Sequence, residues 1–161
     1  LSTNLSIKKL YQEDFYDGNL ILFYISGLSL ELIVIIKMIA AWLFFHLPFL
    51  IIIPIACLIL NVDIEKIFLL IITFVISSPI LTALYSISGS MNLLNDKNFA
   101  MASVIIMLLS IPVIIFSVNL IGSPPKLFKP QLNILLGILL LFLAITPWIS
   151  ASCIKIAIRN K

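Results

Sequence analysis

One histidine is the residue of this sequence whose type and position could support cofactor chemistry. His46 lies within a long apolar run, in the stretch from Trp42 to Pro48. An ionisable side chain inside such a run is a functional candidate by default, and a neutral imidazole can ligate haem iron. A lone histidine can also hydrogen-bond a neighbouring helix and have no further role. We favour the hydrogen bond and keep His46 as a candidate haem ligand.

Sequence motifs for catalysis and for nucleotide binding are absent. The 5 glycines form neither GxxxxGKS/T nor GxGxxG, so these two phosphate-binding loops are not encoded. The single histidine excludes HExxH, and the long apolar runs contain no Asp or Glu for a proton relay or a metal site. The sequence therefore predicts a subunit without catalytic residues or metal ligands, which does not hydrolyse ATP by itself.

An acidic and aromatic stretch near the beginning is the most informative part of the chain. Residues 6–20 read SIKKLYQEDFYDGNL, an amphipathic segment whose predicted helix stops at Gly18. Acidic side chains are repelled by an anionic lipid surface, so this stretch favours a protein partner. A solvated loop is the alternative. The candidate partner-binding residues are Tyr11, Glu13, Asp14, Phe15, Tyr16, Asp17 and Gly18.

Composition indicates the class of protein that positions these residues. Of the 161 residues, 62% are hydrophobic and 11% are charged, and the mean hydropathy is +1.24. These values lie outside the usual range of soluble globular domains. The net charge of +3 is not arranged as a basic patch with interleaved aromatic residues, so nucleic acid is not an expected partner. The sequence predicts an all-α fold, a polytopic bundle of membrane helices.

Four apolar runs are long enough to cross a bilayer. A hydrocarbon core about 30 Å thick requires roughly twenty apolar residues of helix. The connectors between the runs are short, so successive helices should be antiparallel neighbours. The predicted transmembrane helices cover residues 38–60, 67–88, 99–120 and 132–153.

The remaining segments complete a single membrane domain over residues 1–161. We expect residues 1–37 to form a cytoplasmic coupling element and an interfacial segment, and residues 154–161 to form a cytoplasmic tail. The apolar segment 21–36 is interrupted by small polar residues and Glu31, which predicts an interfacial helix or a re-entrant pair of short turns. Lys37 and Trp42 are expected interfacial anchors, a snorkelling lysine and an interfacial aromatic residue.

The basic residues of the short loops predict the orientation of the chain. On one side lie Lys8, Lys9, Lys97, Lys155, Arg159 and Lys161. On the other side lie Lys66, Lys126 and Lys129. The excess on the first side predicts that both termini of this chain are cytoplasmic.

A combination of motifs resembles one known family. The stretch LYQEDFYDGNL carries Glu13-Asp14 and Asp17-Gly18, and Lys37 and Trp42 follow at matching spacing. The run HLPFLIIIPIACLILNVD and the ITPW segment extend the match through nearly the whole chain. This pattern resembles the CcmB family, permease subunits of the haem-exporting ABC system of cytochrome c maturation. The resemblance implies an ABC-2 type architecture of six spans, of which this N-terminally incomplete copy lacks the first two.

The resemblance also implies partners, a ligand and a location. The acidic element would dock on a CcmA-like ATPase, with Asp14 and Asp17 pairing with basic groups and Phe15 or Tyr16 filling an apolar groove. A CcmC-like haem-handling subunit and a small CcmD-like subunit complete the complex, with this chain as a homodimer in the bacterial inner membrane. Haem is the implied transported ligand, with no cofactor bound directly, and ATP acts only through the partner.

Two alternative functions remain open on the sequence. One is an ABC-2 type permease for another substrate, such as a lipid-linked saccharide or a drug. The other is an assembly scaffold that binds partners without transporting anything. Loss of cytochrome c on deletion would separate the first alternative from haem export, and the absence of an ATP-dependent effect would indicate the second.

Overall fold

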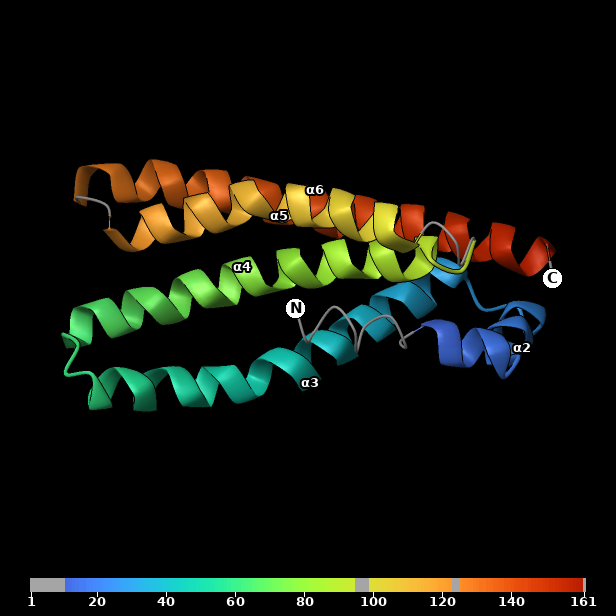
Figure 1. Ribbon diagram of the computed structural model, residues 1–161, viewed down its shortest axis with the longest axis horizontal. Coiled ribbons are helices and arrows are strands. Elements are labelled where there is room, and N and C mark those ends of the chain that lie inside the picture. Colours follow the sequence, from blue (N-terminus) through green and yellow to red (C-terminus); the bar gives the residue numbers. More distant parts are fainter. Residues whose placement is uncertain (1–10, 95–98, 123–124, 161) are drawn as a thin grey trace.

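The computed structural model describes residues 11–94, 99–122 and 125–160, and every regular element in these ranges is a helix (Figure 1). Residues 11–16 are helical. The helices that follow are α2 (Asn19–Ile25), α3 (Leu30–Ile59), α4 (Ile64–Met91), α5 (Phe99–Gly122) and α6 (Pro125–Arg159). Outside the described ranges lie the first part of the amphipathic stretch and four basic residues used to predict the orientation, Lys8, Lys9, Lys97 and Lys161.

The long helices form a bundle in which successive helices run in opposite directions (Figure 1). Helix α4 packs against α3, α5 and α6. Among the described residues, three helices are long and apolar enough to cross a membrane, and a shorter apolar helix forms part of α5. These features confirm the predicted fold class, an all-α polytopic membrane bundle. The three long stretches are Leu30–Ile59, Ile64–Met91 and Leu127–Arg159, and the shorter one is Ile106–Gly122.

The residues at which α3 and α4 end are explained by local backbone conformation and hydrogen bonding better than by the length of the apolar runs. Helix α3 ends just before Asn61, whose φ of 55° is left-handed, a conformation that commonly terminates helices. Helix α4 continues through Gly89 to Met91, past the end expected near Ser88. The hydroxyl of Ser90 donates to the carbonyl oxygen of Ile87 at 2.8 Å. The Ser90 hydroxyl therefore has a hydrogen-bond partner inside α4. The small polar residues at this position continue the helix, although their composition is typical of a connector.

The segment between residues 18 and 30 forms a short helix between two glycine turns. Gly18 and Gly27 have φ values of 81° and 82°, a left-handed backbone that a side chain would strain. Helix α2 lies between them, and α3 begins directly after Ser29. Glu31 therefore lies in the first turn of α3, where a carboxylate interacts favourably with the helix dipole.

Two clusters of buried apolar side chains hold the bundle together. The first joins residues 11–20 to the beginning of α3 and the end of α6, and includes Tyr11, Phe15, Leu20, Leu30, Ile33, Val34, Ala151, Ile154 and Ala157. The second joins α4, α5 and α6, and its fully buried members are Ile80, Val113, Leu120 and Leu135. The first cluster fixes the acidic stretch to the bundle.

Candidate functional site

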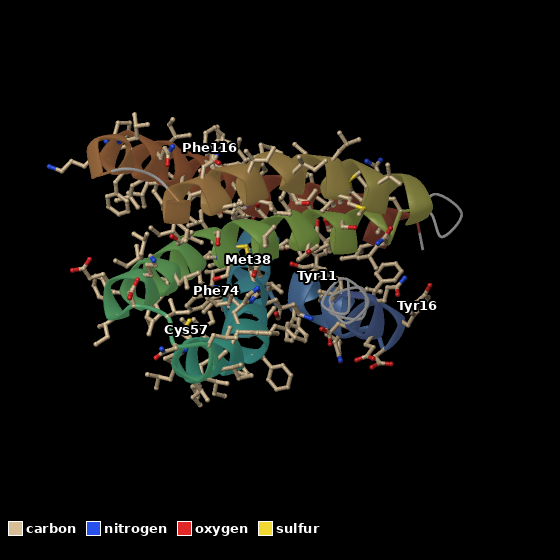
Figure 2. The ribbon with its side chains drawn as sticks, turned by 60° about the vertical axis from the view of Figure 1, so that its left-hand side comes forward. Tyr11, Tyr16, Met38, Cys57, Phe74 and Phe116 are labelled. Carbon is tan, nitrogen blue, oxygen red and sulfur yellow. The ribbon has the colours of Figure 1, made fainter. Side chains whose placement is uncertain are left out.

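Residues 11–18, here called the N-terminal element, lie where α3 begins and α6 ends. Tyr11 and Phe15 point into the first apolar cluster, and the Tyr11 side chain has no exposed surface. Tyr16, by contrast, is 62% exposed. Figure 2 shows Tyr11 beside the bundle and Tyr16 at the outer end of the element. The element therefore has an inner face packed on the bundle and an outer face exposed to its surroundings.

A hydrogen bond joins the inner face of the element to α4. The Tyr11 hydroxyl and the Ser86 Oγ atom are 2.8 Å apart, and either group can donate. Both side chains are buried. Burial raises the pKa of Tyr11 from 10.0 to about 12, while the hydrogen bond with Ser86 acts in the opposite direction. The phenol is thus protonated at neutral pH and available to donate.

An ion pair joins the element to α3. Lys37 pairs with Asp14 through its Nζ atom, and the same atom lies 5.6 Å from the centroid of the Tyr11 ring. The side chains of Lys37 and Asp14 are 19% and 28% exposed, so their attraction is less screened than that of a surface pair. Asn19 also donates from Nδ2 to Asp14 Oδ1 at 3.3 Å. Lys37, expected as an anchor at the lipid interface, has an intramolecular partner.

The predicted docking residues are divided between the two faces of the element. Tyr11, Asp14 and Phe15 make contacts within the molecule. Gly18 forms the turn before α2. The outer face consists of Glu13, Tyr16 and Asp17, which are exposed. A partner that meets the element without unpacking it would touch these three side chains.

Trp42, the second expected interfacial anchor, joins two helices. Its Nε1 atom donates to Ser78 Oγ of α4 at 2.9 Å. The contacts that Ser78 makes with Trp42 and Ser86 makes with Tyr11 were not predicted from the sequence. The signal that could have found them is the spacing of four between successive small hydroxyl side chains, which places them on one face of α4. These side chains are Ser78, Thr82, Ser86 and Ser90.

His46 is buried between α3 and α4. Its ring centroid is 5.9 Å from that of Phe74, at an interplanar angle of 50°. The Nδ1 atom is buried and has no hydrogen-bond partner within the part of the chain that the structure describes. The structure thus gives His46 an aromatic neighbour on α4, and its ligation of haem stays a prediction.

The ionisation of Tyr11 should provide a test of the packed inner face. Because the folded state binds the phenolic proton more tightly than the unfolded chain, this group's contribution to stability should be complete below pH 10.0 and should decline as the pH rises towards about 12. In a spectrophotometric titration of tyrosinate in detergent, Tyr11→Phe should remove a late phase. Loss of amplitude near pH 10.0 in that variant, with the late phase retained, would show instead that Tyr11 ionises like an exposed tyrosine.

Relatives of this chain are named for haem export. The chain is 26% identical over 162 residues to Heme exporter protein B of Haemophilus influenzae, a match that covers 99% of this chain and 73% of the relative. It is 29% identical over 158 residues to Heme exporter protein B of Bradyrhizobium diazoefficiens, covering 96% and 71%. The protein of the same name from Pseudomonas aeruginosa is 27% identical over 163 residues, covering 98% and 72%.

Long apolar helices joined by short connectors define a multi-pass helical membrane protein. A family model described as CcmB protein matches residues 1–157. The chain belongs to the CcmB protein family.

Proposed function

We propose that this chain is a non-catalytic membrane subunit of a haem exporter, in which a partner ATPase drives movement of the membrane helices. The names of the relatives support haem as the exported ligand. Family membership over residues 1–157 supports a role within a transporter complex. The acidic outer face of the N-terminal element supports docking of a partner that carries basic side chains.

The attachment of the N-terminal element to two helices is the observation that carries this proposal. Tyr11 contacts Ser86 of α4, and Asp14 pairs with Lys37 of α3. A force applied to the outer face would therefore act on both helices at once, because the element cannot move without breaking these contacts or carrying α3 and α4 with it. Binding energy can cause motion only through contacts that differ between two states, and a partner that closes on ATP would supply that difference.

The complex and its membrane setting belong to the same proposal. The partners are a CcmA-like ATPase, a CcmC-like haem-handling subunit and a CcmD-like small subunit, and the chain acts as a homodimer in the bacterial inner membrane. The N-terminal element and the end of α6, which carries Lys155 and Arg159, lie at one end of the bundle. This arrangement supports a cytoplasmic position for both, with membrane crossings at 38–60, 67–88, 99–120 and 132–153.

Co-purification with the ATPase subunit tests the docking role of the outer face. We expect Tyr16→Ala/Asp17→Lys to abolish recovery of the ATPase from detergent-solubilised membranes, because the double variant removes an aromatic anchor and reverses a charge at the contact. Both side chains are exposed, and the Tyr16 ring lies edge-on to the buried Phe15 ring with centroids 5.9 Å apart, so the folding of the double variant is measured as well. Glu65→Lys reverses an exposed charge at the opposite end of the bundle and is the matched control.

Equal recovery of the ATPase with Tyr16→Ala/Asp17→Lys and with the unsubstituted protein would contradict the docking proposal. Loss of recovery with Glu65→Lys as well would show that charge reversal acts through general instability. Circular dichroism and gel filtration of each purified variant would verify that the helices and the solution state are preserved.

A further inference from the structure

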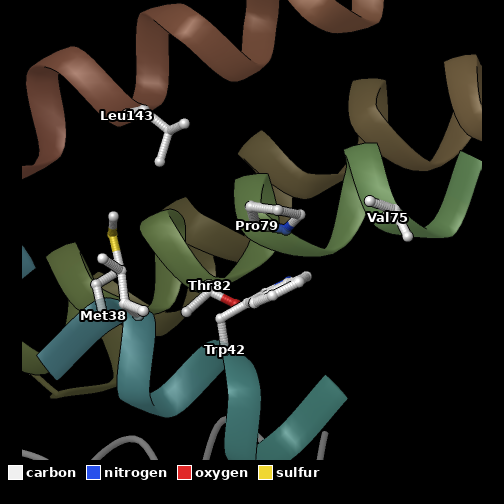
Figure 3. A pocket seen from close by; sticks show the side chains of 7 residues that line it. Met38, Trp42, Val75, Pro79, Thr82 and Leu143 are labelled. Carbon is white, nitrogen blue, oxygen red and sulfur yellow. The ribbon is translucent and has the colours of Figure 1, made fainter. Parts of the chain in front are cut away.

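A cavity of about 220 Å³ lies between α3, α4 and α6 (Figure 3). Helix α4 supplies one wall and the first half of α3 supplies the other, while α6 contributes one side chain. The lining residues are Met38, Ile39, Trp42, Val75, Pro79, Thr82 and Leu143. This volume is several times the roughly 30 Å³ that a water molecule occupies in the liquid.

The walls of the cavity have no polar group in need of a partner. The indole N–H of Trp42 donates to Ser78 Oγ at 2.9 Å, and the Thr82 hydroxyl donates to the backbone carbonyl of Ser78 at 3.0 Å. None of the lining residues carries a charge. A buried water needs two to four polar partners, so water is a poor occupant here. The chemistry of the walls favours a purely apolar ligand.

The position of the cavity identifies the source of that ligand. Its lining comes entirely from the helices that are long and apolar enough to cross a membrane. Ile39 and Val75 line it and are 51% and 38% exposed, so the cavity opens on the outer surface of the bundle. In a bilayer, this surface is in contact with hydrocarbon, and a lipid chain can enter the opening without crossing a polar layer.

We propose that the cavity binds one acyl chain of a bilayer phospholipid, held between α3 and α4 and against the indole ring of Trp42. The chain gains dispersion contacts with walls that would otherwise face a void, since a cavity lining without neighbouring atoms forfeits those contacts. This site is independent of the substrate that the protein exports. It depends only on the membrane location of the three helices.

Quenching of Trp42 by lipids with brominated acyl chains tests the proposal, because bromine quenches indole fluorescence on contact. The sequence contains 2 tryptophans, and Trp148→Phe leaves Trp42 as the sole tryptophan, whose indole is excited selectively at wavelengths that tyrosine does not absorb. This variant is reconstituted into vesicles of phosphatidylcholine with or without brominated chains. We expect strong quenching of Trp42, and we expect Val75→Phe, which fills the mouth of the cavity, to remove most of it. Val118→Phe makes the same exchange at an exposed position of α5 outside the lining and should leave the quenching unchanged.

Native mass spectrometry of the protein released from detergent provides a second measurement that does not depend on the fluorophore. The Val118→Phe protein should retain a bound phospholipid that the Val75→Phe protein has lost. Quenching of equal strength in the Val75→Phe and Val118→Phe proteins would overturn the proposal, because Trp42 would then report only bulk lipid. Absence of quenching in the Trp148→Phe protein would also overturn it and would indicate that a protein segment covers the cavity.

Discussion

Replacement of Tyr11 with alanine is expected to lower the free energy of unfolding by about 3–5 kcal/mol, the range found when a buried aromatic side chain is truncated. The Tyr11 ring is fully buried between the N-terminal element, α3 and α6. Tyr11→Phe keeps the ring but leaves the buried Ser86 hydroxyl without its partner, so we expect a loss of about 1–3 kcal/mol. Denaturant unfolding in detergent micelles, followed by circular dichroism, measures both changes.

The double variant Tyr11→Phe/Ser86→Ala separates the hydrogen bond from the packing. It removes both polar partners, so it should be more stable than Tyr11→Phe alone. If the effects of the two single substitutions simply add in the double variant, the 2.8 Å contact contributes no coupling energy between Tyr11 and Ser86.

Breaking the ion pair between Lys37 and Asp14 is expected to have the second largest effect. Lys37→Met leaves a largely buried carboxylate without its cation, and removal of one member of a fully buried pair costs about 3–5 kcal/mol. Because both side chains retain some exposure, we expect about 1–3 kcal/mol here. The exchanged pair Asp14→Lys/Lys37→Asp should recover part of this loss, and the same unfolding experiment measures it.

An exposed ion pair of the same type provides the control. Lys66 Nζ lies 2.8 Å from Asp63 Oδ2, and these side chains are 63% and 73% exposed. Lys66→Met should leave stability unchanged within error, because water already solvates both charges. If Lys37→Met also leaves the free energy of unfolding unchanged, the ion pair between Lys37 and Asp14 does not attach the N-terminal element to α3.

The length and apolarity of the helices were predictable from the sequence because a membrane span requires a long uninterrupted apolar run. The partners of individual charged residues could not be predicted from the sequence. Lys37 has the sequence context of a snorkelling lysine, but folding places Asp14 beside its amine. The pairing of Lys37 with Asp14 depends on the turn at Gly18 and on the short helix α2, which together bring the N-terminal element beside α3. No local sequence pattern predicts this arrangement.

Which residues of the N-terminal element face the bundle could not be predicted from the sequence either. The helical part of the element spans only residues 11–16, too short for a hydrophobic period to distinguish an inner from an outer face. Phe15 and Tyr16 are adjacent aromatic residues, and the sequence alone predicts either of them as the side chain that fills an apolar groove of the partner. Packing against α6 buries Phe15 and leaves Tyr16 exposed, which confines the proposed docking surface to the outer face.

The central position of α4 has a consequence for biosynthesis. Helix α4 packs against α6, yet the whole of α5 is translated between them. The hydroxyl side chains of Ser78 and Ser86 have partners in segments translated before α4, whereas the buried side chain of Ile80 packs in one cluster with Leu135 of α6. A nascent chain halted before Pro125 would lack Leu135 and leave Ile80 of α4 in contact with lipid, so the apolar packing of α4 is completed only after α6 has been translated.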